Sequence, residues 1–264
     1  MLNTKQLIDD LSNIRSKSPL VHNITNYVVM NNTANGLLAI GASPVMAHAV
    51  EEMEDMVSIA SALVINMGTL SKHWVEAMII AGKTAKSKGI PVVFDPVGAG
   101  ATLYRSETAS IIINECKPDI IRGNASEIMS LAKENITTKG VDSTAASDSA
   151  LEIGKNLALQ TNSVVSISGQ EDFITDGTEV NTIKNGSLFM PKVTGLGCTA
   201  SAITGAFAAV NNDMLAAATH AMAIMGIAGE LAAAKSEGTG SMQVNFIDML
   251  YNITGEIITK NLRQ

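Results

Sequence analysis

A cysteine follows a glycine-leucine-glycine turn in the segment 193–199 (VTGLGCT), just where a long apolar helix is expected to begin. Glycines at such a turn let the backbone approach a ligand closely and adopt positive φ angles. The amides of the first helical turn are free, and the helix dipole favours an anion there. We therefore predict that Gly195 and Gly197 form a nest for a phosphate, and that the same field favours the thiolate of Cys198.

This turn is a weak signal by itself, because glycine pairs often serve only a tight turn and a buried cysteine is usually a small apolar side chain. Other polar or glycine-rich segments, however, also follow apolar runs of strand length. They are 66–69, 95–100, 122–127 and 168–169. Because ligands of an open parallel sheet bind beyond the carboxyl ends of the strands, we expect these segments to converge on one site.

Two carboxylates and one arginine in these segments are suited to binding a metal and a phosphate. Asp95 is expected near Mg²⁺ or a phosphate, with a solvated or turn-capping aspartate as the alternative. Glu127 can hold Mg²⁺ through water, but its spacing from Asn124 also fits a helix capping box. Arg122 suits a phosphate clamp, or else an ion pair with one of the two carboxylates.

A nucleotide phosphate chain, Mg²⁺, an arginine and an anion nest together are the parts of a phosphoryl-transfer site. The GxxxxGK[ST] motif of P-loop enzymes and the motif set of protein kinases are absent from the sequence. A GxGxxG pattern is also missing after the first strand, which argues against an ordinary dinucleotide-binding domain.

Alternating apolar strands and helices must position these segments. Strands are predicted at 43–47, 62–66, 91–95, 119–122 and 163–168, and helices at 2–15, 31–40, 51–58, 72–88, 107–116, 125–133 and 144–160. This alternation predicts parallel βαβ units with right-handed crossovers. The remainder is expected to contain an antiparallel hairpin (172–176 and 178–184), one more strand at 187–193, and then helices with a turn at 238–241.

Composition and charge narrow the function further. With 264 residues, 46% of them hydrophobic and 3% aromatic, the chain suits one large α/β domain with closely packed helices. A net charge of −7 without a basic run argues against nucleic acid as a partner.

The cysteines and the apolar segments bear on the compartment. Cys116 and Cys198 lack the spacing of a zinc site and fit a reducing cytoplasmic compartment. The N-terminus does not have the pattern of a signal peptide. The apolar stretch 199–234 is interrupted by polar residues, so we expect neither half to reach the ~20 apolar residues of a membrane span.

Several blocks of the chain closely resemble the hydroxyethylthiazole kinase family of thiamine salvage, in the ribokinase-like superfamily. They are 19–26, 35–46, 66–70, 95–101 (DPVGAGA), 122–127 (RGNASE) and 195–198 (GLGC), and they extend over nearly the whole chain. The resemblance implies a ribokinase-like three-layer α/β/α fold with a mainly parallel central sheet, as a single kinase domain over residues 1–264. It also implies a homotrimer with sites at the subunit interfaces.

The reaction implied by the resemblance is transfer of the γ-phosphate of ATP to the primary alcohol of 4-methyl-5-(2-hydroxyethyl)thiazole. Cys198 stands where relatives in the superfamily usually have an aspartate base, and it would lie beside the substrate hydroxyl. The resemblance implies a thiazole pocket that comprises Met46, Gly195, Asn26, Gly68 and Thr69. It implies a nucleotide site formed by Arg122, Ser168 and Gly197. It also implies that Asp95 and Glu127 lie around Mg²⁺. Leu196 departs from the family pattern, which often has a smaller residue or threonine between the two glycines. Thr199 and Ser201 are expected to face the phosphates.

Three other functions stay open on the sequence alone. A related kinase of another small vitamin alcohol or sugar is the closest, although such enzymes usually carry aspartate at the position of Cys198. A cysteine acyl-transfer enzyme would use Cys198 as nucleophile and one histidine as base. The histidines available for that role are His22, His48, His73 and His220. A catalytically inactive relative would bind nucleotide without turnover.

Overall fold

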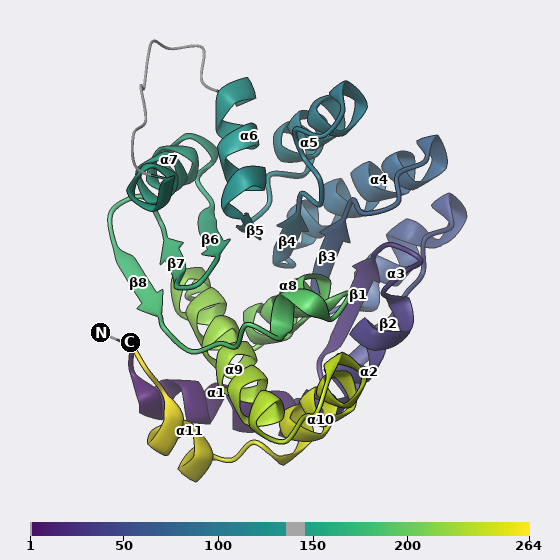
Figure 1. Ribbon diagram of the computed structural model, residues 1–264. Helices are drawn as coiled ribbons and strands as arrows, with labels where there is room; N and C mark the ends of the chain where they lie inside the picture. The colour runs from purple at the N-terminus through teal and green to yellow at the C-terminus, as the bar shows by residue number, and fades with distance from the viewer. Residues whose placement is uncertain (1, 136–145) are drawn as a thin grey trace.

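An eight-stranded sheet forms the centre of the computed structural model, which describes residues 2–135 and 146–264 (Figure 1). The strands are β1 (Leu20–Ile24), β2 (Ser43–Val45), β3 (Ala62–Asn66), β4 (Val92–Asp95), β5 (Ile120–Asn124), β6 (Val164–Ser168), β7 (Asp172–Thr175) and β8 (Val180–Ile183). Their order is β2-β1-β3-β4-β5-β6-β7-β8. Neighbours from β2 to β6 are parallel, whereas β7 and β8 form the antiparallel hairpin that the sequence predicts.

Helices cover both faces of this sheet, so the predicted three-layer arrangement is confirmed (Figure 1). One face carries α3 (Met53–Ile59), α4 (Lys72–Lys88), α5 (Leu103–Cys116), α6 (Ala125–Asn135) and α7 (Ala146–Thr161). The other carries α1 (Thr4–Lys17), α2 (Met30–Ile40), α8 (Leu196–Ala208), α9 (Met214–Ala234), α10 (Thr239–Asn252) and α11 (Gly255–Asn261). Two 3₁₀ helices, η1 (Val50–Glu52) and η2 (Met190–Lys192), complete the described elements.

Side chains along the central strands alternate between two apolar cores. Leu63 and Ile65 of β3 pack in the core beneath α3 to α7, whereas Val64 packs in the core on the opposite face. All residues of β3 are buried, as expected for a parallel strand that is covered on both sides. The sequence signal of such a strand is therefore a continuous apolar run.

The prediction of a strand at 187–193 is wrong. The structure has a loop that leads into η2, and Pro191 in this helix has no amide to donate to a strand ladder. Met190 instead packs against Gly229 of α9, where an added Cβ would collide with its side chain. Because of this contact with α9, the segment between β8 and the glycine turn does not pair with the edge strand of the sheet.

Among the other differences from the predictions are a missed strand and shifted helix ends. β1 is not among the predicted strands, because His22 and Asn23 interrupt its apolar run. The turn expected at 238–241 is the first turn of α10, with Gly238 as its N-cap. The predicted helix 144–160 is observed as α7 from Ala146, and residues 144 and 145 lie outside the described residues.

Helix α9 corrects the expectation that neither half of the apolar stretch 199–234 is long and apolar enough for a membrane span. Its 21 residues are apolar enough, by length and composition alone, to cross a membrane. However, 72% of its most apolar window is buried inside the fold, as in the core helices of globular proteins. His220 of this helix is 1% exposed and bonds Asp10 of α1 at 2.7 Å. It is therefore a partnered core histidine, which does not favour the acyl-transfer alternative.

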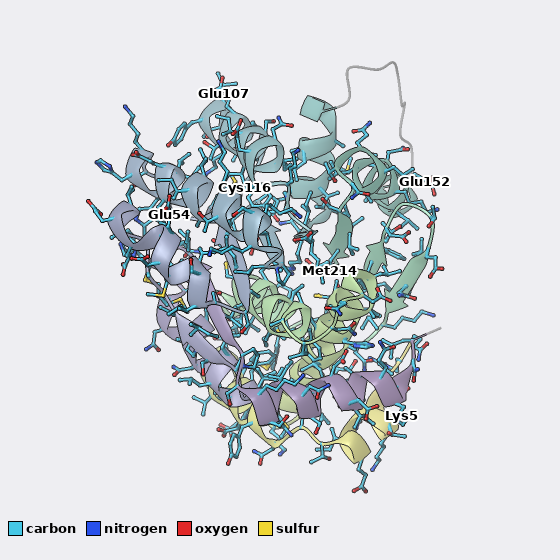
Figure 2. All side chains as sticks on the ribbon, turned by 180° about the vertical axis from the view of Figure 1, so that it is seen from behind. Lys5, Glu54, Glu107, Cys116, Glu152 and Met214 are labelled. Atoms are coloured by element: carbon cyan, nitrogen blue, oxygen red, sulfur yellow. The ribbon has the colours of Figure 1, made fainter. Side chains whose placement is uncertain are left out.

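Charged side chains and the second cysteine lie in opposite environments. Glu54, Glu107 and Glu152 project from the outer helices at the periphery of the molecule (Figure 2). Cys116 is buried between α4 and α5, and its Sγ lies 3.6 Å from the carbonyl oxygen of Met78. Burial raises the pKa of this thiol to about 12, so Cys116 serves as an apolar core residue.

Candidate active site

Asp95 lies in a buried polar network at the carboxyl end of β4. Its neighbour in the strand register is Asn66, the last residue of β3. Asp95 is 1% exposed, and its Oδ2 accepts hydrogen bonds from Asn66 Nδ2 (2.8 Å) and from Ser201 Oγ of α8 (2.7 Å). The alternative of a solvated, turn-capping aspartate is therefore wrong.

The network continues from Asn66 to three residues of the predicted site. Asn26 follows β1, and its Nδ2 donates to Asn66 Oδ1 (2.9 Å) and lies 3.5 Å from Cys198 Sγ. The amide of Gly68 donates to the same oxygen of Asn66 (3.0 Å). A Cβ on Gly68 would lie 2.5 Å from Asn26 Nδ2, so a side chain there would displace Asn26. The structure thus brings Asn26, Gly68 and Cys198 together.

The glycine turn forms the start of α8. Gly195 is the N-cap with φ +88°, a conformation that glycine adopts readily and other residues avoid. A Cβ on Gly195 would also lie 2.9 Å from Val29 Cγ1. Leu196 is buried in the apolar core of this layer. Its departure from the family pattern therefore falls in the core rather than among polar groups.

Arg122 connects β5 to this turn. Its Nη1 donates to the carbonyl oxygen of Gly197 (3.1 Å), and its Nη2 donates to Ser168 Oγ at the end of β6 (2.8 Å). Among the described residues Arg122 forms no ion pair within 4.0 Å, so the alternative of an ion pair with Asp95 or Glu127 is wrong. Its buried Nε has no hydrogen-bond partner in the same residues. A buried guanidinium with a spare donor fits an anionic ligand such as a phosphate.

Glu127 is held by backbone amides on both of its carboxylate oxygens. Oε1 accepts from the amide of Gly98 (2.9 Å) and Oε2 from the amide of Asn124 (2.9 Å), while Asn124 Oδ1 accepts from the amide of Glu127 (3.0 Å). The predicted capping box is therefore confirmed. Through Gly98, Glu127 also shapes the loop after Asp95, in which Gly98 and Gly100 have positive φ angles.

The electrostatics of Asp95 suit a divalent cation. Burial raises its pKa to about 6 against the opposing effects of Arg122 and Ser201, and the negative charge of Glu127 adds to the rise. A cation with a preference for oxygen ligands would relieve this cost of burying a carboxylate. The described residues contain no group of three or more His, Cys, Asp or Glu side chains that could hold a metal. Water and phosphate oxygens would therefore have to supply the other ligands.

Cys198 is a thiol at neutral pH, contrary to the prediction. The pKa of this half-buried side chain is raised to about 11. Burial is the largest cause, and the negative charge of Asp95 adds to it. Hydrogen bonds from two asparagines and the charge of Arg122 act in the opposite direction but do not outweigh burial.

The remaining predicted residues have different positions. Thr69 Oγ1 accepts from the amide of Tyr27 (3.3 Å), next to Asn26 in the chain. Met46 follows β2, which pairs in parallel with β1, so it lies at the same edge of the sheet. Thr199 and Ser201 are both at most 1% exposed, and Ser201 faces Asp95. That these two hydroxyls face the phosphates stays a prediction; the buried Thr199 Oγ1 has no hydrogen-bond partner among the described residues.

Two features at this end of the sheet could not be predicted, because no sequence motif marks them. Arg105 of α5 donates hydrogen bonds to three backbone carbonyls of the loops after β3 and β4. The ring of Tyr27 packs against Trp74 and His48, with centroid separations of 4.9 and 6.2 Å. Because these rings come from three separate segments, only the folded chain brings them together. A cluster of aromatic rings beside Thr69 suits a small aromatic ligand.

Asp172, at the start of β7, shapes the turn after Ser168. Its Oδ1 accepts a hydrogen bond from the amide of Gly169 (3.0 Å). Burial raises the pKa of Asp172 to about 6, although the Gly169 amide and the charge of Arg122 oppose this rise.

We expect the free energy of unfolding of the wild type to fall as Asp172 loses its proton with rising pH, and Asp172→Asn to lack this decrease. The folded-state pKa of about 6 exceeds the ordinary aspartate pKa of 3.8, so the folded protein binds the extra proton between these values. The corresponding stability is complete below the unfolded pKa and is lost as the pH rises through the folded pKa, at up to about 1.4 kcal/mol per pH unit. Urea unfolding between pH 4 and 8 should show the free energy of unfolding of the wild type, relative to the variant, falling up to about pH 6 and then staying constant. A difference that is independent of pH would contradict this.

The model of the hydroxyethylthiazole kinase family matches residues 11–256 of the chain. The chain belongs to this family. The hydroxyethylthiazole kinase of Leptospira biflexa serovar Patoc is 58% identical over 258 residues, which cover 98% of this chain and 97% of the relative. That of Brachyspira hyodysenteriae is 57% identical over 249 residues, which cover 94% of each chain. The family resemblance of the sequence is thereby confirmed.

Solved structures agree with the fold. The hydroxyethylthiazole kinase protein from Pyrococcus horikoshii OT3 superimposes with a TM-score of 0.92 at 41% identity, covering 98% of both chains. Pyridoxal kinase from Staphylococcus aureus in complex with AMP-PCP superimposes with a TM-score of 0.61 at 16% identity, covering 81% of this chain and 88% of that one. The second likeness shows the fold alone, and both are consistent with the ribokinase-like architecture.

Proposed function

We propose that this kinase transfers the γ-phosphate of ATP to the primary alcohol of 4-methyl-5-(2-hydroxyethyl)thiazole, as a step of thiamine salvage and biosynthesis. One observation carries the proposal, a hydrogen-bonded network that runs from Asn26 through Asn66 to Asp95 and adjoins Cys198. Ser201 joins this network to the glycine turn, because its hydroxyl contacts both Asp95 and the carbonyl oxygen of Gly197. Arg122 donates to the same carbonyl oxygen. An alcohol pocket and an anion nest are thereby held side by side. Membership of the hydroxyethylthiazole kinase family supports the choice of substrate.

The acceptor would bind on the side of β1 and β3. We propose that Asn26, Gly68, Thr69 and Met46 line the pocket of the thiazole ring, beside the aromatic cluster of Tyr27. The thioether of Met46 is polarizable and adaptable, which suits a ring that contains sulfur. Gly195, with its positive φ, lets the backbone approach the alcohol closely.

The donor would bind on the side of β5 and β6. Arg122, Ser168 and Gly197 already contact one another, and the spare Nε of Arg122 is available to an anionic oxygen. Free amides at the start of α8 add to this attraction. Because the transition state of phosphoryl transfer spreads negative charge over the phosphate oxygens, fixed donors here would stabilise it.

Mg²⁺ is proposed near Asp95, with Glu127 acting through water. Each oxygen of Glu127 accepts one backbone amide and keeps a further lone pair, with which it would accept a hydrogen bond from a water of the ion. When bound, Mg²⁺ would neutralise charge on the phosphates. Asp95 would hold the ion at the end of β4, between the donor and acceptor sides of the site.

Cys198 is proposed to orient the substrate hydroxyl rather than to ionise it. In the reaction the alcohol oxygen bonds to the γ-phosphorus, the bond from that phosphorus to the leaving oxygen of ADP breaks, and the proton of the alcohol passes to a phosphate oxygen or to water. A loose transition state needs little help from a base, because the hydroxyl becomes acidic as its oxygen bonds to phosphorus. A thiol with a pKa of about 11 is compatible with this weak role.

We expect Cys198→Ala to lower kcat only moderately, by about tenfold, and Cys198→Asp to remain active. A carboxylate at position 198 can accept the proton, whereas alanine leaves the transition-state contacts of Arg122 and Asp95 in place. Steady-state kinetics with ATP and the thiazole alcohol measure both effects. A folded alanine variant that binds both substrates but has no turnover would contradict the weak role.

The experiment that tests the proposed function is ATP turnover with Mg²⁺, in the presence and absence of the thiazole alcohol, with the phosphorylated product identified by mass. Thiazole-dependent formation of ADP is the expected result. Turnover with another vitamin alcohol instead, such as a pyrimidine or pyridoxal, would move the assignment to a related kinase. Tight nucleotide binding without turnover would indicate an inactive relative.

Assembly, extent and compartment are part of the same proposal. We propose that residues 1–264 form one ribokinase-like kinase domain that works as a cytoplasmic homotrimer. Tyr27 and Val28 are each 65% exposed beside the pocket, and such apolar side chains suit coverage by another subunit. Light scattering should give three times the chain mass of 27.6 kDa.

A further inference from the structure

Arg105 joins two loops that are distant in the sequence. Its Nη1 donates to the carbonyl oxygens of Met67 (2.7 Å) and Val97 (2.7 Å), and its Nη2 donates to that of Gly68 (2.7 Å). Met67 and Gly68 follow β3, whereas Val97 follows β4. Charge-assisted hydrogen bonds of this length are among the stronger ones in proteins. One side chain therefore holds the ends of two neighbouring strands together.

The position of Arg105 in its own helix is unfavourable. It lies in the first turn of α5, where Thr102 Oγ1 caps its amide at 3.3 Å. A positive charge at a helix N-terminus opposes the helix dipole. Among the described residues no carboxylate lies within 4.0 Å to form an ion pair with this guanidinium. An arginine at this position therefore stabilises the fold through its hydrogen bonds to the two loops, and not through its own helix or an ion pair.

The two loops belong to different parts of the proposed site. The loop after β3 carries Gly68 and Thr69, which are proposed to line the alcohol pocket. The loop after β4 begins beyond Asp95, which is proposed to hold Mg²⁺. Glu127 fixes the second loop from the other side through the amide of Gly98 (2.9 Å). Arg105 and Glu127 thus hold this loop by its carbonyl and amide groups respectively.

We propose that Arg105 is a positioning residue that sets the alcohol pocket against the loop after Asp95. This inference rests on the proposed function. Its guanidinium touches neither substrate and acts through the backbone of Gly68 and Val97. The planar fork of arginine reaches three carbonyls at once, which the single ammonium group of lysine matches less well. Its loss should let the acceptor pocket move relative to the bound phosphate.

The expected result for Arg105→Met is a KM for the thiazole alcohol about tenfold higher and a lower kcat, since small misplacements of reacting groups slow a reaction strongly. The KM for ATP should change by less than about twofold, because Arg105 does not contact Arg122, Ser168 or Gly197. Arg105→Lys should recover part of the loss. A residue that served only stability would not separate the two KM values in this way.

Arg15 supplies a matched control. Its Nη2 also donates to backbone carbonyls, those of Leu250 (3.4 Å) and Tyr251 (3.0 Å), and so ties α1 to the end of α10 away from the site. Arg15→Met removes a comparable arginine-to-carbonyl clamp. It should lower stability without changing the KM for the alcohol.

Hydrogen exchange of the full-length protein provides a readout that does not depend on activity. The amides of Gly68, Gly98 and Gly100 are all hydrogen-bonded in the structure. In Arg105→Met and Arg105→Lys they should exchange faster than in the wild type or in Arg15→Met. If Arg105→Met does not fold, the exchange rates and KM values of Arg105→Lys test the proposal.

Three outcomes would overturn the proposal. They are an unchanged KM for the alcohol in a folded Arg105 variant, the same kinetic change in Arg15→Met, and unchanged exchange at the two loops. A wild-type protein that does not phosphorylate the thiazole alcohol would overturn the proposed function instead. In that case the exchange measurement still decides whether Arg105 holds the two loops together.

Discussion

Replacing Asp95 by asparagine should lower kcat about a thousandfold while leaving the folded protein at least as stable as the wild type at pH 8. The loss of rate follows if the carboxylate holds the cation that neutralises the phosphates. Asparagine has nearly the same shape, and its amide oxygen can still accept the hydrogen bonds from Ser201 and Asn66 that now reach Asp95 Oδ2 at 2.7 and 2.8 Å.

The stability part of this prediction depends on the sign of the pKa shift. Burial raises the pKa of Asp95 to about 6 from the ordinary aspartate value of 3.8. The stability associated with the protonated carboxyl is therefore complete below the unfolded pKa and is lost as the pH rises through the folded pKa. At pH 8 the wild type carries a buried charge that the asparagine variant lacks.

Asp119→Asn is the control for the Asp95 variant. Asp119 precedes β5 at the other edge of the sheet, where its Oδ2 accepts the amide of Val92 (2.8 Å) and its Oδ1 pairs with Lys86 (2.7 Å). Its replacement should leave kcat unchanged. Activity of Asp95→Asn within tenfold of the wild type, measured at saturating Mg²⁺, would argue against a metal-binding role for Asp95.

Replacing Arg122 by methionine should lower kcat/KM for ATP by about a hundredfold to a thousandfold. Arg122 is 8% exposed, and its buried Nε has no hydrogen-bond partner among the described residues. Its removal takes away the positive charge that faces the proposed phosphates. Arg122→Lys should be intermediate, because an ammonium group cannot keep the contacts with Gly197 and Ser168 and also serve the nucleotide.

Nucleotide titration monitored by calorimetry separates the binding part of this effect from kcat. Arg263→Met is the matched control, because Arg263 pairs with Glu230 and donates to the carbonyl oxygen of Lys184 (3.1 Å) near the C-terminus. That variant should bind ATP as the wild type does. Unchanged ATP affinity and kcat in a folded Arg122→Met protein would remove Arg122 from the nucleotide site.

Much of the fold could be predicted because its elements have strong local signals. The limits of β3 and α4 agree with the predictions to the residue, since a buried parallel strand is a continuous apolar run and Gly89 ends α4 in the left-handed conformation. The segment 187–193 also has an apolar, strand-like pattern, but Pro191 and the contact of Met190 with α9 exclude it from the sheet. Tertiary packing there outweighs local propensity.

The order of strands and loops along the chain was enough to predict which segments meet at one end of the sheet, since residues that follow parallel strands must lie together. It also contained the capping box of Glu127 and the glycine turn before α8, because both depend on residues close together in the chain. These local signals, with the family blocks, were sufficient for the fold and the family.

The chemical state and the hydrogen-bond partners of the site residues, by contrast, depend on contacts that form only in the folded chain. Burial makes Cys198 a thiol, Arg122 pairs with a carbonyl and a hydroxyl instead of a carboxylate, and Arg105 joins two loops. The reason is physical. The pKa of a group depends on its desolvation, and its hydrogen bonds depend on atoms that arrive from residues as far as 172 positions away, as for Asn26 and Cys198. Neither quantity is contained in a local pattern of residue types.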